Sequence, residues 1–207
     1  MQTEVLPAQD PAAVRYAADV LRHDGLVAFP TDTVYGVGAL VFREAAVQRL
    51  YRVKGRSTDK AIAVLVAHNA DLLNIAGTLT ASAQLMAQKF WPGPVTLVVP
   101  KHPLLPKAVS PLPTVGVRQP NHPLVRQLLT LTGPLAVTSA NRSGDANTLT
   151  AQEVLAQLNG RIDLILDGGR VNGGVPSTVV DCTRDDPVIL REGPVSAEQI
   201  AEALKRV

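Results

Sequence analysis

Short apolar runs alternate with helical patterns through most of this 207-residue chain. Continuous apolar runs predict strands that are buried on both faces of a sheet. They lie at residues 26–29, 61–67, 95–99, 114–117, 135–138, 162–166, 178–181 and 188–191. Apolar residues spaced at helical intervals predict helices at 43–54, 72–75, 81–89, 123–131, 151–158 and 197–205. The alternation indicates an α/β fold with about eight strands and six helices.

The two apolar runs nearest the C-terminus follow each other with no helical pattern between them. Strands connected this directly pair antiparallel, because parallel neighbours need a crossover connection. The sheet is therefore expected to be mixed. No repeat, low-complexity tract or shift in composition divides the chain, so we expect residues 1–207 to form one domain.

The charge and the cysteine content limit which partners and which cellular location we expect. The 20 basic and 18 acidic side chains nearly balance, so the net charge of +2 does not by itself require a nucleic-acid partner. The single cysteine, Cys182, lies in an apolar run and is expected to be a buried, unreactive thiol. Without a disulfide, a leader pattern or a long apolar run, we expect a cytoplasmic protein with no membrane span.

The segment FPTDTVYGVG at 29–38 is the most informative stretch of the chain. Pro30 ends an apolar run because proline cannot donate to the strand ladder. Hydrogen-bonding side chains follow at Thr31, Asp32, Thr33 and Tyr35. Ligands gather at the carboxyl ends of strands in open α/β sheets, so this segment is a candidate ligand cradle. A glycine-rich turn that caps a following helix is the alternative.

Basic residues gather in other polar segments. Lys54, Arg56 and Lys60 fall within seven residues and lead into an apolar run, an arrangement that suits a polyphosphate. Arg118 ends an apolar strand and should therefore face an anion. A carboxylate substrate and a structural aspartate both fit that position.

Small donors follow a further apolar run in the segment TSANRSG at 138–144. Backbone and hydroxyl donors in such a turn form a nest for an anion. Ser177 and Arg191 add a hydroxyl and another cation. Together these segments predict a basic concave site.

The usual catalytic sets are missing from the sequence. There is no G-x-S-x-G elbow, no H-E-x-x-H pair and no phosphate-binding P-loop, and the four histidines lie in unrelated contexts. A cationic site without an evident nucleophile or base is typical of reactions driven by positioning and charge neutralisation. Nucleotidyl and phosphoryl transfer are such reactions.

Five blocks of the sequence, in order, resemble the YrdC-like threonylcarbamoyl-AMP synthases. They are FPTDTVYG at 29–36, KxR at 54–56 with Lys60, WPGPVT at 91–96, VxVRxPxHP at 115–123 and TSANxSG at 138–144. The endings PSTVVD at 176–181 and ILRxG at 189–193 also agree, and the match runs from about residue 25 to residue 193.

The resemblance implies a YrdC-like single domain with a twisted mixed β-sheet, flanking helices and a large basic concave site. It implies an enzyme, a nucleotidyltransferase that forms L-threonylcarbamoyl-adenylate and pyrophosphate from L-threonine, bicarbonate or CO2, and ATP. Mg2+ would be held by the ATP phosphates. The product would serve t6A modification of tRNA adenosine-37 through a separate transferase complex. The chain resembles the short members, which lack the additional C-terminal domain of longer relatives.

The resemblance also implies roles for individual residues. Those expected to hold L-threonine are Thr33, Leu65, Arg118, Ser139 and Ser177. Those expected to hold ATP are Arg56, Lys60, Thr114, Asn141 and Arg191. Tyr35 and Lys54 are expected to line the same cavity, with Thr138 and Ser143 in support. Some members have histidine at the position of Leu65, so a contact there would be apolar or through the backbone.

Two other functions stay open at this point. One is a YrdC-like paralogue with another acceptor, such as the carbamoyl-adenylate-forming module of hydrogenase maturation factors, whose cysteine-rich segments have no counterpart in this chain. The other is a module that binds double-stranded RNA or tRNA through the basic concavity. The pI near 8.9 permits weak RNA binding, but no motif of stacking aromatic residues supports it.

Overall fold

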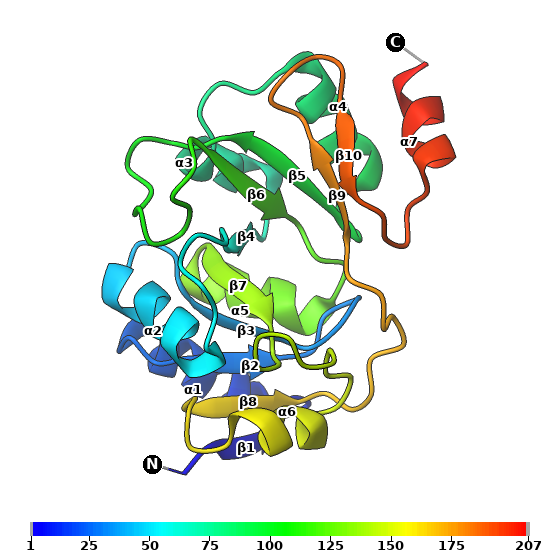
Figure 1. The fold of residues 1–207 in the computed structure, drawn as a ribbon. Coiled ribbons are helices and arrows are strands. Elements are labelled where there is room, and N and C mark those ends of the chain that lie inside the picture. The colour runs from blue at the N-terminus through cyan, green and yellow to red at the C-terminus, as the bar shows by residue number, and fades with distance from the viewer. Residues whose placement is uncertain (1, 206–207) are drawn as a thin grey trace.

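The computed structural model describes residues 2–205 as one ten-stranded mixed sheet with helices on both faces (Figure 1). The strands are β1 (Glu4–Pro7), β2 (Val27–Phe29), β3 (Gly36–Leu40), β4 (Ala63–Leu65), β5 (Val95–Pro100), β6 (Thr114–Arg118), β7 (Leu135–Ser139), β8 (Leu164–Asp167), β9 (Thr178–Asp181) and β10 (Val188–Arg191). Their order across the sheet is β1-β8-β2-β3-β7-β4-β6-β5-β9-β10.

The helices in the described part of the chain are α1 (Pro11–Arg22), α2 (Glu44–Lys54), α3 (Leu72–Ile75), α4 (Ala81–Phe90), α5 (Pro123–Thr132), α6 (Ala151–Leu158) and α7 (Ala197–Leu204), with a 3₁₀ turn at Asn69–Asp71. The α/β class and the mixed sheet are therefore confirmed. Strands β9 and β10 pair antiparallel, with Ile189 opposite Val180, as their direct connection predicts.

Three elements of the fold were not predicted. Helix α1 has a regular start, because the Asp10 side chain caps it and Pro11 occupies its first turn. Strand β1 is a short edge strand that pairs with β8. Strand β3 lies in the segment interpreted as a loop, and it pairs antiparallel with β2 and β7. The 29–38 segment therefore leads into a strand, and the alternative of a cap for a following helix is wrong.

Two glycines of β3 explain why that strand was missed. Glycine weakens a strand unless another group approaches closely. A Cβ atom at Gly36 would lie 2.9 Å from Cγ1 of Val137 on β7, and one at Gly38 would lie 3.1 Å from Cγ2 of the same side chain. The glycines therefore make room for Val137, and local strand propensity carries no sign of this.

The helices divide the apolar core into two layers. Residues from α2, α3, α4, α6 and α7 pack on one face of the sheet. Helices α1 and α5 pack on the other face, against apolar side chains of β2, β4, β7 and β8. That second layer includes no residue of β5, β6, β9 or β10. The α1/α5 face is consequently left open over those strands.

Two expectations about the chain as a whole can be compared with residues 2–205. No helix among them is both long and apolar enough to cross a bilayer. Cys182 is fully buried, and burial raises the pKa of its thiol to about 12. A thiol held neutral in this way is unreactive at ordinary pH, as predicted.

Candidate active site

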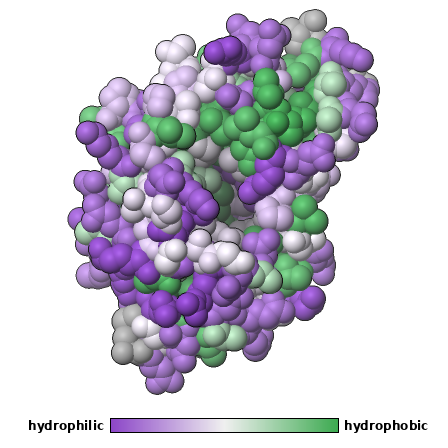
Figure 2. All heavy atoms as spheres, in the orientation of Figure 1, coloured by the Kyte–Doolittle hydropathy of each residue, from purple (hydrophilic) through white to green (hydrophobic). Residues whose placement is uncertain are grey.

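A cavity of about 380 Å³ opens on the α1/α5 face, where the surface is hollowed in Figure 2. Its walls come from the β2–β3 loop, from β4, β5, β6 and β7, and from the segments around β9 and β10. Three arginines, Arg56, Arg118 and Arg191, line it together with threonine and serine hydroxyls. None of the described lining residues carries a carboxylate. The cavity is thus cationic and rich in hydrogen-bond donors, as the sequence predicted.

Arg118 reaches from the end of β6 to the β2–β3 loop. Its Nη2 donates to the Asp32 carboxylate, its Nη1 donates to the Thr33 hydroxyl at 3.0 Å, and its Nε donates to the Gly93 carbonyl at 3.1 Å. The Arg118 and Asp32 side chains are only 7% and 14% exposed. The structural-aspartate interpretation of Arg118 is therefore confirmed. Not all of its N–H groups are used, however, so it can also donate to a ligand in the cavity.

The β2–β3 loop is ordered by its own hydroxyls. Thr31 Oγ1 donates to the Val34 carbonyl at 2.7 Å and accepts from the Thr33 N–H at 3.1 Å. The Thr33 hydroxyl lies 2.9 Å from Thr31 Oγ1 and also accepts from Arg118. This local turn fixes the Thr33 hydroxyl at the cavity wall.

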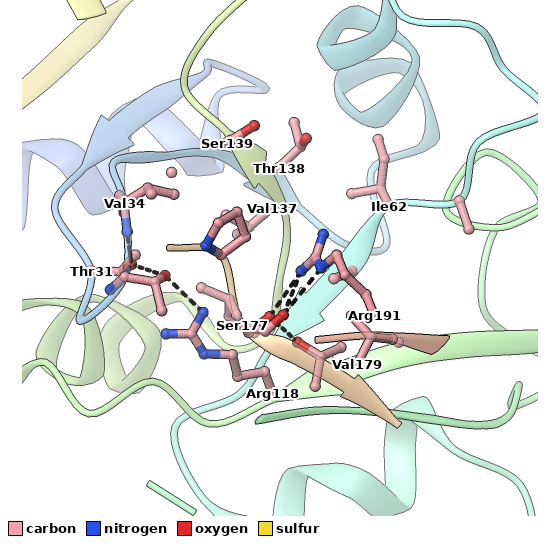
Figure 3. Close-up of a pocket in the computed structure, with 18 of the residues that line it drawn as sticks. Thr31, Val34, Ile62, Arg118, Val137, Thr138, Ser139, Ser177, Val179 and Arg191 are labelled. Atoms are coloured by element: carbon pink, nitrogen blue, oxygen red, sulfur yellow. Dashed lines mark hydrogen bonds between the residues drawn. The ribbon is translucent and has the colours of Figure 1, made fainter. Parts of the chain in front are cut away.

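Ser177 and Arg191 are in direct contact. Arg191 donates to the Ser177 carbonyl from Nε at 3.1 Å and from Nη2 at 2.8 Å. The Ser177 hydroxyl lies 2.8 Å from Thr96 Oγ1. In Figure 3 the guanidinium groups of Arg118 and Arg191 lie on either side of Ser177. Burial lowers the pKa of Arg118, and the charge of Arg191 lowers it further while Asp32 opposes the shift.

Arg56 is held by backbone carbonyls of the loop that follows α2. Gly55 ends the helix in a left-handed conformation with φ of 60°. Arg56 Nη2 then donates to the Ala61 carbonyl at 2.8 Å, and Nε donates to the Lys60 carbonyl at 3.3 Å. Burial lowers the pKa of Arg56. The loop thus presents this guanidinium to the cavity.

The cavity brings together eight of the predicted site residues. They are Thr33, Arg56, Leu65, Arg118, Thr138, Ser139, Ser177 and Arg191. The predicted site residues that do not line it are Tyr35, Lys54, Lys60, Thr114, Asn141 and Ser143. Every residue expected to contact threonine belongs to the first set. The residues expected to contact ATP are split between the two.

Two of the residues expected to hold ATP, Thr114 and Lys60, lie outside the cavity lining. Thr114 comes two residues before Gly116, which lines the cavity, and alternate residues of a strand share a face. Its side chain therefore lies on the cavity side of β6. Lys60 is exposed, and only its backbone carbonyl contacts Arg56. Their contacts with ATP remain predictions.

Lys54 does not line the cavity, contrary to the prediction. It ends α2, is 3% exposed, and donates from Nζ to the carbonyls of Ser139 and Asn141. Burial lowers the pKa of Lys54 to about 8, with a contribution from Arg56. The lysine therefore ties the helix to the end of β7, because those two carbonyls are the acceptors within its reach. Its effect on the cavity is indirect.

Tyr35 also points away from the cavity. Its hydroxyl donates to the Gly169 carbonyl at 2.8 Å and accepts from the Gly168 N–H at 3.2 Å. Burial raises its pKa to about 12, so it stays neutral and can serve as both donor and acceptor. Tyr35 consequently anchors the loop after β8 instead of contacting a ligand.

The 141–144 turn uses its polar groups internally. Asn141 Nδ2 donates to the carbonyls of Arg142 and Asp145, both at 2.8 Å. Asn141 Oδ1 is buried without a hydrogen-bond partner among the described residues. Ser143 is exposed, and its N–H donates to the Lys54 carbonyl at 2.8 Å. The turn is thereby braced against α2, with Asn141 and Ser143 outside the cavity lining.

The structure adds lining residues to which the sequence assigned no role. They are Val34, Gly36, Ala61, Ile62, Ala63, Thr96, Val98, Gly116, Val137, Asn147, Pro176 and Val179. Several fall inside the matched sequence blocks, which are the signal that could have found them. Asn147 lies after the last of the five ordered blocks, in a stretch without periodicity, and no local pattern points to it.

The buried charge of Lys54 should affect the pH dependence of stability. Its folded pKa of about 8 lies below the ordinary 10.5, so between these values the unfolded chain binds more protons than the folded one. Stability relative to a Lys54→Met variant should therefore rise from about pH 8 to about pH 10.5, by up to about 3 kcal/mol. Urea unfolding at about pH 7 and about pH 10 measures this. The exposed Lys89→Met is the matched control, and an identical pH profile for both variants would contradict the assignment.

The chain is an α/β protein with a mixed sheet, and the arginine-lined cavity near the strand ends is suited to an anionic ligand. The family model described as telomere recombination, which groups Sua5, YciO and YrdC, matches residues 19–193. The chain belongs to this family, and the predicted resemblance is confirmed.

Similar sequences and a similar solved structure agree with the family assignment. The chain is 41% identical over 201 residues to threonylcarbamoyl-AMP synthase of Bacillus subtilis, with 96% of this chain and 58% of the relative covered. It is 38% identical over 199 residues to putative threonylcarbamoyl-AMP synthase of Mycobacterium tuberculosis, with 96% and 92% covered. The structure of Pyrococcus abyssi Sua5 complexed with L-threonine matches with a TM-score of 0.93 at 38% identity, with 98% of this chain and 61% of that one covered. The chain thus spans less than two thirds of the Bacillus and Pyrococcus proteins.

Proposed function

We propose that this chain is a nucleotidyltransferase that forms L-threonylcarbamoyl-adenylate and pyrophosphate from L-threonine, bicarbonate or CO2, and ATP. The observation that carries the proposal is the cavity in which Arg118, Ser177 and Arg191 meet. Relatives named for this activity and a Sua5 structure named for its L-threonine complex support it. We also propose that residues 1–207 form one domain, of which Met1 and residues 206–207 lie outside the described part.

Threonine would bind at the Arg118 side of the cavity. The guanidinium suits the substrate carboxylate because charge-assisted hydrogen bonds are about twice as strong as neutral ones. The Thr33 and Ser177 hydroxyls would contact polar atoms of the substrate, with Ser139 beside them. Leu65 is buried and lines the same wall, where it offers an apolar contact to the threonine methyl group.

ATP would bind at the side lined by Arg56 and Arg191. Two guanidinium groups provide the planar donors that phosphate oxygens accept. Lys60 would add an exposed point charge to the phosphates. Thr114 and Asn141 would complete the subsite as the family match implies. Because Arg191 donates to Ser177, the ATP and threonine subsites would share a wall.

The reaction balances without a protein base at the reacting oxygen. The neutral threonine amine adds to CO2 and releases a proton to solvent, which gives an anionic carbamate. A carbamate oxygen then attacks the α-phosphorus of ATP, and the bond to the β-phosphate oxygen breaks to release pyrophosphate. The arginines of the cavity would orient both reactants and screen the charge on the phosphates.

Mg2+ would enter this site with ATP. No group of three or more His, Cys, Asp or Glu side chains among residues 2–205 is arranged to hold a metal ion. The three arginines of the cavity are cations that do not ligate metal ions, and none of the described lining residues carries a carboxylate. The ion would therefore be part of the MgATP substrate. The product would pass to the transferase complex that modifies tRNA adenosine-37, and direct tRNA binding by this chain would be weak.

Pyrophosphate release tests the proposed function. The purified chain is incubated with MgATP and bicarbonate, and L-threonine is compared with L-serine, glycine and no amino acid. We expect release that depends on threonine. Release with no preference for threonine would indicate a paralogue with another acceptor. No release, together with salt-sensitive RNA binding, would instead favour the RNA-binding module.

A further inference from the structure

One carboxylate oxygen of Asp32 has no hydrogen-bond partner among the described residues. Asp32 Oδ1 accepts from Arg118, whereas Oδ2 is buried and has no hydrogen-bond partner among the described residues. Asp32 itself does not line the cavity, although Thr31 and Thr33 on either side of it do. The second oxygen is therefore directed into the protein, where a donor has to be found for it.

His122 holds a matching unpartnered atom. It occupies the position before α5, four residues after Arg118, but its side chain makes no capping hydrogen bond to that helix. Its Nδ1 is buried and has no partner among the described residues. Burial lowers the pKa of the imidazole, and the charge of Asp32 acts in the opposite direction. Asp32 bonds to the Arg118 side chain, and His122 follows Arg118 by four residues, so both unpaired atoms belong to the surroundings of Arg118.

We propose that His122 donates a hydrogen bond from Nδ1 to a water that donates in turn to the second oxygen of Asp32, and that His122 so fixes the carboxylate that orients Arg118. This inference rests on the proposed function, because it concerns how the threonine subsite is held. His122 is a positioning residue: it acts on Arg118 through Asp32 and does not contact substrate.

The physical basis is the cost of leaving two buried polar atoms unpaired. Each unpaired atom loses its hydration without compensation, whereas one bridging water satisfies both. Hydrogen bonds of active sites are often long or poorly aligned without substrate and tighten in the complex. With His122 in place, one oxygen of Asp32 accepts from Arg118, and the other is connected to His122 at the start of α5. Arg118 then needs no reorganisation to receive the threonine carboxylate.

Substitutions at position 122 separate this role from helix capping. Asparagine keeps a donor near the Nδ1 position and is also a good N-cap residue. Aspartate is an equally good N-cap but has no donor and places a negative charge beside Asp32. If His122 only starts α5, both variants should behave alike. If it donates to Asp32, only asparagine should preserve the site.

The kinetic test measures pyrophosphate release as threonine and ATP are varied separately. We expect His122→Ala to raise the KM for threonine about fivefold, the effect of one lost hydrogen bond, with the KM for ATP unchanged. His122→Asn should restore the wild-type value and His122→Asp should not. The exposed His23→Ala is the control for loss of a histidine. Equal values for the asparagine and aspartate variants, or an unchanged KM in His122→Ala, would overturn the proposal.

A measurement without activity keeps this test distinct from the proposed function. In ¹⁵N-histidine-labelled wild-type protein, the nitrogen shifts of His122 should report a neutral ring protonated at Nδ1. Asp32→Asn should lower its pKa further, since the carboxylate favours the charged ring. A His122 ring protonated at Nε2, or a His122 pKa that is unchanged in Asp32→Asn, would overturn the contact. If threonine-dependent release fails in the wild type, the proposed function fails, and these shifts alone decide the contact.

Discussion

Replacing Arg118 with alanine should raise the threonine concentration needed for half-maximal pyrophosphate release by about tenfold or more. A lost charge-assisted hydrogen bond to the substrate carboxylate corresponds to about 1.5–3 kcal/mol. The KM for ATP should change much less, because Arg118 lies at the threonine side. Initial rates measured over a range of threonine at saturating ATP test this.

The same substitution should also destabilise the fold. Arg118 and Asp32 form a largely buried pair, and removing one partner of a buried pair costs about 3–5 kcal/mol. Arg118→Lys is therefore the informative companion, since it keeps a charge beside Asp32 but loses the planar fork that suits a carboxylate. Arg22→Ala, at an exposed ion pair with Asp19, is the control. Unchanged threonine dependence in a folded Arg118 variant would refute the carboxylate role.

Replacing Arg56 with alanine should raise the KM for ATP by about tenfold or more and leave the threonine KM nearly unchanged. Arg56 lines the cavity and is held there by the carbonyls of Lys60 and Ala61. Lys60→Ala should also weaken ATP use, but by a smaller factor, because the lysine side chain is exposed. ATP titrations at low and high salt test both.

Salt separates the two contributions. An exposed charge is screened at high ionic strength, so the effect of Lys60→Ala should shrink there while that of Arg56→Ala persists. The exposed Arg52→Ala, in the last turn of α2 and outside the cavity lining, controls for the loss of a cation near the loop. If Arg56→Ala matched Arg52→Ala in ATP dependence, Arg56 would have no place in the ATP subsite.

Much of the fold could be predicted because periodicity is a local property. The buried runs and amphipathic faces recur as β5, β7, α6 and most other elements with small changes at their ends. Helix α1 also carries readable signals in Asp10 and Pro11, so its absence from the prediction was avoidable. Strand β3 could not be predicted in this way, because its glycines are needed where the Val137 side chain approaches closely, from a strand about a hundred residues away.

The residues of the candidate site also fall into those that could be predicted from the sequence and those that could not. Arg118 and the Thr33 hydroxyl could be predicted, because polar groups that follow or end buried strands gather at one region of the sheet. The side-chain directions of Lys54 and Tyr35 could not, since their hydrogen-bond partners lie 85 and 134 residues away. A cationic segment in the sequence therefore indicates the kind of ligand. Which cations reach the cavity depends on contacts that only the fold reveals.

The most direct test of the central proposal is detection of the product itself. The chain is incubated with MgATP, L-threonine and ¹³C-bicarbonate, and the mixture is analysed at once by mass spectrometry. We expect an adenylate with the mass of threonylcarbamoyl-AMP that carries one ¹³C, which is absent without threonine and reduced in the Arg118→Lys variant. Pyrophosphate formed without this labelled adenylate, or an adenylate that incorporates no bicarbonate carbon, would contradict the proposal.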